Sequence, residues 1–197
     1  MEIRTERLLL RRFRESDREP FAALNADPRV MRHFRGPLDR AASDAFLDRI
    51  EHAFATRGWS LWAVEVLGGD DFIGFVGLWE PGFDAPFTPT VEIGWRLAAH
   101  AWGQGYATEG ANAALDDGFV RCGLEEVVSF ATAANHASRA VMERLGMVHC
   151  PDEDFEHPSV PAGHPIRPHV LYRFPDPAAR RLEAFARHGH ASGSGPS

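Results

Sequence analysis

Short stretches in which apolar and polar residues alternate recur along the chain, and this period of two is typical of β-strands with one buried face. β-branched and aromatic residues are frequent in these stretches, which favours strand over helix. The pattern predicts strands at residues 7–13, 59–67, 72–79, 90–97, 127–132, 147–150 and 169–174. Between the second and third of them, Gly68-Gly-Asp-Asp71 predicts a tight hairpin turn.

Other stretches place apolar residues three and four positions apart, which predicts helices with one buried face. Ser16-Asp-Arg-Glu19 has the pattern of a capping box, with Pro20 in the first turn, and predicts a helix to about Asn25. A second helix is predicted at residues 40–57, ending at Gly58. Its expected buried face holds Ala42, Ala45, Phe46, Ile50, Ala53 and Phe54.

Further helices are predicted after residue 105, between Asn135 as N-cap and Gly146 as stop, and at 177–188. The predicted order is strand, two helices, three strands, helix, strand, helix and two strands. No repeat or second domain is visible. We therefore expect one domain at 7–175, followed at 176–197 by a short helix and a flexible tail.

The composition is that of a soluble globular protein, with 44% hydrophobic and 25% charged residues among 197. There is no apolar run long enough to cross a bilayer and no signal peptide, so we expect a cytoplasmic protein without a membrane partner. The net charge of −7 argues against a nucleic-acid partner and suits a cationic substrate. Cys122 and Cys150 have no metal or redox spacing. Monomer and homodimer both remain open.

The most informative stretch joins the strand at 90–97 to the next helix through Trp102-Gly-Gln-Gly-Tyr-Ala-Thr-Glu109. The first N–H groups of a helix have no partner within it, and the helix dipole places partial positive charge there. Gly103 and Gly105 carry no Cβ, so an anion could approach the backbone closely. The stretch predicts a phosphate-binding loop made of amides, with an ordinary strand-to-helix turn as the alternative.

Two other phosphate loops fit these residues less well. A Walker A loop requires Gly-Lys-Ser/Thr, which the chain lacks. A dinucleotide fingerprint requires a third glycine where Thr108 stands, and an acid at the end of the next strand. Here Glu125 and Glu126 precede that strand instead. An enzyme linked to NAD is therefore a remote alternative, which binding of a dinucleotide but not of coenzyme A (CoA) would revive.

Four motifs in this order resemble the GNAT N-acetyltransferase superfamily, in its RimJ/RimL-like branch. They are Glu92-Ile-Gly-Trp95, Trp102-Gly-Gln-Gly-Tyr-Ala-Thr-Glu109, Asn135-His-Ala-Ser138 and Arg144-Leu-Gly-Met147. The resemblance spans about residues 7–174. It implies an α/β fold of the mixed α+β kind, whose mixed central sheet has splayed fourth and fifth strands and helices on both faces. It also implies acetyl-CoA as co-substrate, no metal, and acetyl transfer to a primary amine of a peptide, a protein N-terminus or a small molecule.

The resemblance further implies which residues hold acetyl-CoA. The pantetheine arm would lie as a pseudo-strand against the unpaired edge of the splayed strand, with the pyrophosphate on the loop. The residues expected at the cofactor are Trp95, Arg96, Leu97, Trp102, Gly103, Gln104, Gly105, Tyr106, Ala107, Thr108 and Asn135. Trp102 replaces the arginine or glutamine usual at the loop entrance, so we expect its side chain not to bind phosphate as those residues do.

Two residues are candidates for the proton transfers. Glu92 lies on the strand beside the expected thioester, where several relatives carry a carboxylate base; the alternative is an ion pair with an arginine of the sheet. Ser138 takes the place of the acid in RimL-like proteins, and its alternative is support of the helix cap. The tyrosine acid and second base of other relatives correspond to Met142 and Phe130, which cannot serve. Glu109 is expected to be structural or substrate-facing.

The acceptor site is the part that the sequence determines least. The loop at 80–89, with Phe83 and Phe87, is either a passive surface loop or a substrate wall. The proline-rich segment 151–168 has no zinc-like spacing, so we expect ordinary loop histidines at His157, His164 and His169 and no metal site. We expect an α-amine to be preferred over a lysine because its pKa is lower. The alternative function is a CoA-binding sensor or regulatory protein without turnover.

Overall fold

The computed structural model describes residues 1–191, with side chains to residue 187, and its centre is a mixed sheet of nine strands. The strands are β1 (Glu2–Arg4), β2 (Leu8–Arg11), β3 (Leu61–Val66), β4 (Gly74–Trp79), β5 (Glu92–Leu97), β6 (Val128–Thr132), β7 (Val148–His149), β8 (Phe155–Glu156) and β9 (Pro168–Arg173). Their order in the sheet is β1-β2-β3-β4-β5-β6-β9-β7, and β8 pairs with β9 outside this order.

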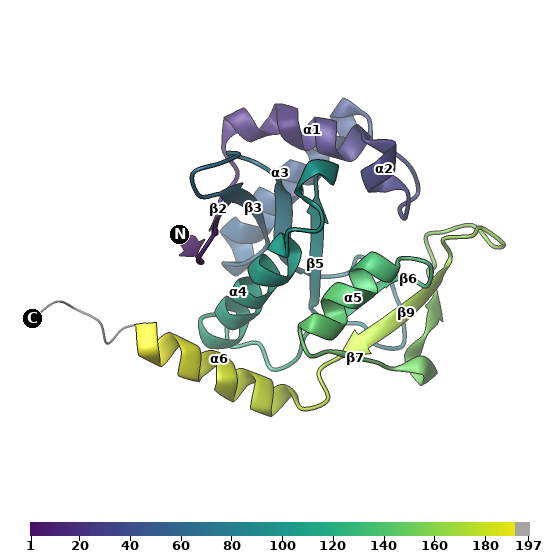
Figure 1. Cartoon of the computed structure of the whole chain (residues 1–197). Coiled ribbons are helices and arrows are strands. Elements are labelled where there is room, and N and C mark those ends of the chain that lie inside the picture. Colours follow the sequence, from purple (N-terminus) through teal and green to yellow (C-terminus); the bar gives the residue numbers. More distant parts are fainter. Residues whose placement is uncertain (192–197) are drawn as a thin grey trace, which may run out of the picture.

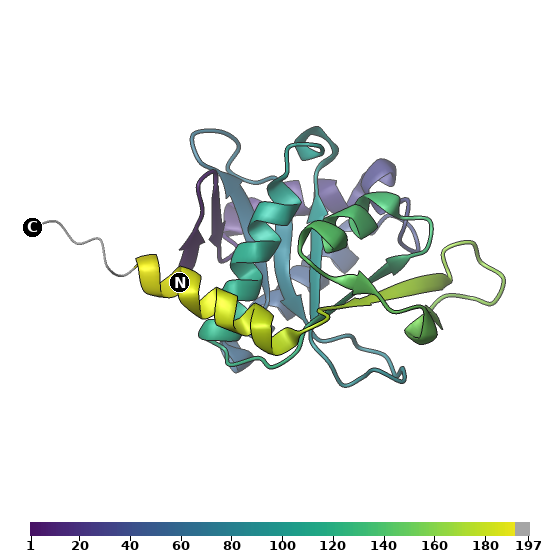
Figure 2. The ribbon, with the colours of Figure 1, turned by 60° about the horizontal axis from the view of Figure 1, so that its bottom comes forward.

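Six α-helices cover the two faces of this sheet. They are α1 (Arg18–Ala26), α2 (Pro28–Met31), α3 (Arg40–Arg57), α4 (Tyr106–Val120), α5 (His136–Arg144) and α6 (Pro177–Ala191). The first three lie on one face, and the last three lie on the other, where α6 crosses α4 (Figures 1 and 2). The expected mixed α/β fold with helices on both faces is confirmed.

Pairing between β4 and β5 decides which side chains face which helices. Trp79 pairs with Glu92 and Phe75 with Arg96, so Glu92, Gly94 and Arg96 share the face of α1 and α3. The other face of β4 packs closely on α4. A Cβ added at Gly110 of α4 would lie 2.9 Å from a side-chain atom of β4, so only glycine permits this approach.

β5 and β6 are the only parallel neighbours in the described sheet, and they separate almost at once. Glu92 opposite Val128 is their single backbone pair. Beyond it the two strands diverge (Figure 1), and side chains begin to fill the gap, as when Ser129 Oγ donates to the carbonyl of Ile93 at 2.9 Å. The splayed strand pair implied by the family resemblance is therefore present, and it leaves one edge of β5 open.

Both faces of the sheet bury large apolar side chains. One continuous core joins β2, β3, β4 and β5 to α1, α3 and α4, with Leu8, Phe21, Ile50, Trp62, Ile93 and Phe119 among its fully buried members. A smaller cluster joins Phe87 of the 80–89 loop to Val128 and Leu171 of the sheet. No helix within residues 1–191 is long and apolar enough to cross a membrane.

Several sequence-based expectations need correction. Ser16 does not cap α1, because the chain first makes a 3₁₀ turn at Glu15–Asp17 and α1 begins at Arg18. The carboxylate of Asp17 there binds the buried guanidinium of Arg11 at 2.6 Å, so a tertiary ion pair sets the start of the helix. The strands β1 and β8 were not expected, since elements of three and two residues are too short to show a period.

The buried face of α3 also differs from the expected one. Ala42 and Ala45 are exposed, whereas Ser43 and Leu47 are buried. Ser43 belongs inside because its hydroxyl accepts a hydrogen bond of 2.9 Å from the buried amide of Asn25, a partner that no helical periodicity reveals. At the C-terminus, α6 extends to Ala191, three residues into the expected tail, and residues 192–197 lie outside the described chain.

Candidate active site

The loop between β5 and α4 presents free backbone amides. Gly103 and Gly105 have φ of 75° and 81°, a left-handed backbone that favours glycine, and Gly105 is the N-cap of α4. The first helical bond runs from Glu109 N to Gly105 O at 3.0 Å, and no described side chain caps the helix. The amides that open α4 are therefore available to an anion.

A cavity of about 680 Å³ runs from this loop along the open edge of β5 to α5. Every residue expected at the cofactor lines it: Trp95, Arg96, Leu97, Trp102, Gly103, Gln104, Gly105, Tyr106, Ala107, Thr108 and Asn135. Arg32 and Arg144 lie in the same wall and add positive charge to that of the amides, whereas Arg29, also in this wall, is paired with Asp27 at 2.7 Å. Amides, cations and an unpaired strand edge are groups that suit a long ligand with phosphates at one end.

The open edge of β5 belongs to alternate residues. Because Val128 N donates to Val91 O, the backbone groups of the odd-numbered residues point toward β6. Two of the carbonyls already have side-chain donors, Ser129 Oγ at Ile93 and the indole Nε1 of Trp102 at Leu97, the latter at 2.8 Å. The backbone of Trp95, between them, has no partner in the described sheet, so a ligand amide could pair there.

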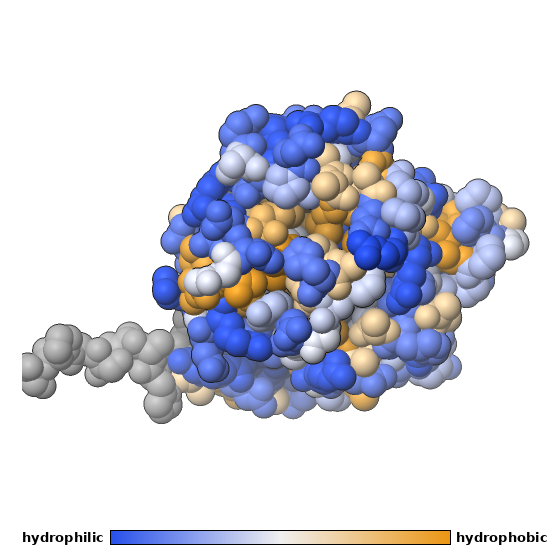
Figure 3. Space-filling model, turned by 45° about the horizontal axis from the view of Figure 1, so that its top comes forward, coloured by the Kyte–Doolittle hydropathy of each residue, from blue (hydrophilic) through white to orange (hydrophobic). Residues whose placement is uncertain are grey.

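A second cavity of about 340 Å³ adjoins the first. Both are lined by His33, Phe34, Trp95, Arg96, Asn135 and Ser138, so the two spaces meet at the point where β5 and β6 diverge. The rest of the second wall includes the aromatic side chains Phe46, Phe75, Trp79, Phe83 and Phe130. Figure 3 shows apolar residues gathered in the middle of this face of the molecule, with hydrophilic residues around them.

Glu92 lies in the wall of the second cavity, at the start of the splayed pair. Its carboxylate has no hydrogen bond or ion pair with any described residue, so the expected alternative of an ion pair with an arginine of the sheet is not realised there. Burial among apolar groups raises the pKa of the Glu92 carboxyl to about 8. A carboxyl with this pKa is poised to accept a proton near neutral pH.

Comparison with known proteins identifies the family to which this chain belongs. The sequence model of the acetyltransferase (GNAT) domain matches residues 7–148. The chain belongs to the GNAT family of acetyltransferases. A curated relative from Aspergillus fumigatus, named FsC-acetyl coenzyme A-N(2)-transacetylase, is 32% identical over 160 residues, which cover 75% of this chain and 65% of that protein.

Solved GNAT structures share the fold. A crystal structure of an acetyltransferase from Agrobacterium tumefaciens is 28% identical, has a TM-score of 0.70, and is matched over 88% of this chain and 94% of that one. The ribosomal L7/L12 α-N-protein acetyltransferase RimL, solved with CoA, has a TM-score of 0.71 at 17% identity, over 90% of this chain and 99% of that one. The RimJ/RimL resemblance is thereby confirmed at the level of fold, and the protein is a GNAT acetyltransferase.

Asn135 and Ser138 lie at the start of α5, which forms one side of the first cavity. Asn135 is its N-cap, as expected, and its side-chain oxygen accepts from Ser138 N at 3.2 Å. The backbone of Ser138 thus supports the cap. Its hydroxyl has no partner in the described chain and lies where the two cavities meet, so it also remains a candidate donor to a leaving thiolate.

Arg7 contacts the loop between β5 and α4 from outside, and the sequence analysis did not single it out. Its Nη1 donates to the carbonyl of Gln104 at 2.9 Å, and its Nη2 lies 3.4 Å from the position of a Cβ at Gly105. Glu109 holds it through an ion pair of 2.6 Å and also accepts from Thr5, which makes Glu109 structural. No local pattern announces Arg7, because the loop lies about a hundred residues further along the chain.

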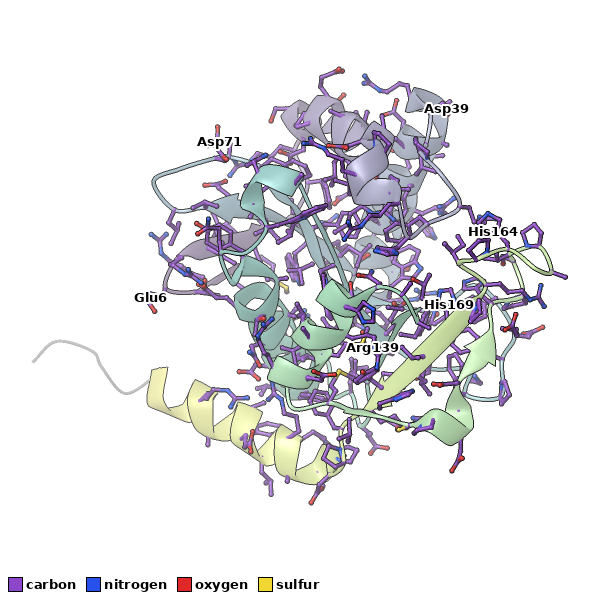
Figure 4. The ribbon with its side chains drawn as sticks, turned by 45° about the vertical axis from the view of Figure 1, so that its right-hand side comes forward. Glu6, Asp39, Asp71, Arg139, His164 and His169 are labelled. Carbon is purple, nitrogen blue, oxygen red and sulfur yellow. The ribbon has the colours of Figure 1, made fainter. Side chains whose placement is uncertain are left out.

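Of the three histidines expected in the loop, His157 and His169 lie close together and His164 lies apart. His164 lies on the loop that leads to β9, at the outer edge of the molecule, and His169 lies on β9 itself, nearer the centre (Figure 4). His157 and His169 both line the second cavity, with ring centroids 5.0 Å apart. Within the described chain no three His, Cys, Asp or Glu residues are placed to hold a metal.

Proposed function

We propose that the protein transfers the acetyl group of acetyl-CoA to a primary amine that enters the second cavity. The observation that carries this proposal is the junction of the two cavities, with Glu92 in the wall of the second. One cavity suits the cofactor by its amides, cations and open strand edge, and the other offers an apolar space that contains a candidate base. The bound cofactor would supply an activated acetyl group as a thioester.

In the proposed reaction the neutral amine nitrogen attacks the thioester carbonyl carbon. The carbon–sulfur bond then breaks, and the extra proton on nitrogen passes to the Glu92 carboxylate, directly or through water. The departing thiolate takes a proton from Ser138 or from solvent. A thiol with a pKa of about 8.5 leaves readily, so a weak acid suffices. Holding both reactants in adjoining cavities contributes on the order of 7 kcal/mol or more to lowering the barrier.

Two residues complete the proposed binding of the cofactor. The free amides of α4 would hold the pyrophosphate, and Arg7, fixed above the loop by Glu109, would bind phosphate in place of the side chain at position 102. The backbone of Trp95 would pair with an amide of the pantetheine arm.

The acceptor is proposed to be an α-amine of a peptide or small molecule in preference to a lysine, because less base is needed to neutralise an amine of lower pKa.

A panel of amines tests this function. Free thiol release and product mass are measured with acetyl-CoA at one pH, using peptides with a free N-terminus and no lysine, N-terminally blocked peptides with one lysine, and small α-amines. We expect products from free α-amines and slower turnover of the blocked lysine peptides. Tight CoA binding with no acetylated product from any amine would instead indicate a CoA-binding regulatory protein. Faster turnover of the lysine peptides would overturn the α-amine preference.

A further inference from the structure

Arg96 is a half-buried arginine without an anionic partner, placed where the two cavities meet. Its Nη1 donates to the neutral amide oxygen of Asn25. Its Nε is buried and has no hydrogen-bond partner, and the guanidinium forms no ion pair with a carboxylate of residues 1–187. Most of its hydrogen-bonding capacity is therefore unused by the protein.

The two almost fully buried arginines of the described chain, Arg11 and Arg180, are paired. Arg11 binds Asp17 at 2.6 Å and Glu65 at 2.7 Å, and Arg180 binds Asp116 at 2.8 Å. Burying a charge is costly unless an opposite charge or several hydrogen bonds compensate it. Burial lowers the pKa of Arg96 to about 10, which leaves it cationic at neutral pH. An unpaired cation in a cavity wall suits a site whose anion arrives with a ligand.

Aromatic rings hold the Arg96 guanidinium in place. Its Cζ lies 4.1 Å from the ring centre of Phe34, 5.2 Å from that of Phe75 and 5.9 Å from that of Phe46. Such contacts attract the cation and orient its plane, but ring faces do not replace the hydrogen bonds that a carboxylate accepts. The group is thus preorganised while its donors remain available.

Glu92 and Arg96 stand on one face of β5, on either side of Gly94. Four residues of strand separate their Cα atoms by about 13 Å. The Glu92 carboxylate leans toward the middle, since its Oε1 lies 3.6 Å from the position of a Cβ at Gly94. The wall of the second cavity therefore presents a carboxyl group and a guanidinium across a floor that carries no side chain between them.

The anion that pairs with Arg96 is more readily supplied by the acceptor than by the cofactor. The anionic groups of CoA are its phosphates, whereas the pantetheine arm and the acetyl group are uncharged. Phe46 and Phe75, which pack on Arg96, line the second cavity and not the first. The histidines of that cavity, His33, His157 and His169, have lowered pKa values through burial and add no competing cation at neutral pH.

Resting on the proposed acetyl transfer, we propose that Arg96 binds a carboxylate of the acceptor, so that the substrate is an amino acid or a close analogue. The amine would face Glu92, the carboxylate would pair with Arg96, and an apolar side chain would lie against the aromatic wall. Arg96 is then a specificity-determining residue, because an amine without a carboxylate leaves the half-buried guanidinium unpaired.

The test compares L-phenylalanine with L-phenylalanine amide as acceptors, in the wild type and in Arg96→Met and Arg96→Lys. The readout is the ratio of kcat/KM for the acid to that for the amide. Differences in amine pKa cancel, because every variant receives the same pair. We expect Arg96→Met to lower this ratio on the order of 10- to 100-fold, as befits loss of a charge-assisted hydrogen bond, and Arg96→Lys to retain part of it.

A binding measurement makes the test independent of turnover. We expect 3-phenylpropionate, a carboxylate without an amine, to bind the CoA-loaded wild type in calorimetry and to bind Arg96→Met far more weakly. An unchanged acid-to-amide ratio, or equal binding of 3-phenylpropionate to both proteins, would overturn the assignment. Weakened CoA binding in Arg96→Met with the ratio intact would assign Arg96 to the cofactor instead. Absence of any acetylated amine would contradict the proposed function, and the 3-phenylpropionate result would still decide the role of Arg96.

Discussion

At the scale of single residues, burial gives Glu92 a pKa that suits the proposed base. An exposed glutamate is ionised and a weak base at neutral pH, whereas the apolar wall around Glu92 raises its pKa to about 8. Because the shift is upward, the carboxyl is largely protonated at pH 7 and takes the form of the proposed base as the pH rises through 8. The acceptor amine deprotonates over a similar range, so two ionisations should control the rate.

We therefore expect Glu92→Gln to change both the size and the shape of the pH profile of kcat/KM. Below pH 7 the slope of its logarithm should approach about 2 for the wild type, where base and amine must both lose a proton, and about 1 for the variant. Above pH 8 the variant should be slower by on the order of 10²–10⁴-fold. Stopped-assay kinetics between pH 6 and 9.5 with an α-amine acceptor measure both quantities.

The matched control is Glu126→Gln, which removes a glutamate from the surface, outside both cavities, where it pairs with Arg173. Its profile should match that of the wild type, and CoA affinity should be nearly unchanged in both variants. A Glu92→Gln profile parallel to the wild type, with no rate loss, would remove Glu92 from the mechanism.

Some features of single residues in the site could be predicted from the sequence, and others could not. The motif residues expected at the cofactor line one cavity, and all but Asn135 do so because strand, loop and helix follow one another in the chain. The isolation of Arg96 was not predictable, since it depends on what α1, α3 and β4 place around it. Whether Glu92 has an ion-pair partner was likewise undecided until the facing of β5 and its surroundings were known.

At the scale of elements, the loop and the start of α4 act as one unit. Asn135 and Gly146 gave α5 its expected start and stop because capping is a local interaction. The start of α1 was predicted wrongly because Arg11 and Asp17 override the local signal. The loop and the start of α4 are an intermediate case. The glycines of the loop predict it locally, whereas Arg7, which contacts the loop and pairs with Glu109, comes from the distant start of β2.

The element-scale prediction concerns Gly105→Val. The variant should lose CoA binding by about 100-fold or more, because valine resists the positive φ and its side chain would point toward Arg7 in the space assigned to phosphate. Isothermal calorimetry with CoA measures the change. Gly123→Val is the matched control, since Gly123 also has a positive φ, of 68°, but lines neither cavity.

Both glycine variants should lose comparable thermal stability, because both force a branched residue into the left-handed region. Only Gly105→Val should lose CoA affinity. Equal CoA affinity of the two variants, with the fold intact by circular dichroism, would show that the phosphates do not lie on this loop.

At the scale of the whole molecule, α6 joins the C-terminal part of the chain to α4, the helix that follows the loop of Gly103 and Gly105. It lies across α4 (Figure 2), outside the residues that the GNAT family model matches. Asp116 of α4 binds Arg180 at 2.8 Å and Arg187 at 2.7 Å. A helix was expected here, but its docking was not, because nothing in the sequence indicates that Asp116 pairs with arginines so distant in the chain.

Asp116 should therefore contribute to the stability of the molecule and not to catalysis. Burial alone would raise the pKa of its carboxyl, but hydrogen bonds from Arg187 and Arg180 outweigh this and lower it. A lowered pKa in the folded state means that the contribution is present above about pH 4, the pKa of an unfolded aspartate, and is lost as the pH falls through the folded value.

The last prediction is that Asp116→Asn lowers the free energy of unfolding at pH 7 by about 3 kcal/mol, because it leaves the buried Arg180 without an anion. For a chain of this size the midpoint of thermal unfolding should fall by roughly 6–12 °C. Arg187→Ala is the matched control: its guanidinium is 48% exposed, so its loss should cost only about 1 kcal/mol. Thermal melts at pH 7 and pH 3.5 should show a smaller loss of stability toward acid in Asp116→Asn than in the wild type. Equal destabilisation by the two substitutions, or an unchanged acid dependence, would mean that α6 is held by its apolar contacts, such as those of the buried Ala184, and not by this ion-pair network.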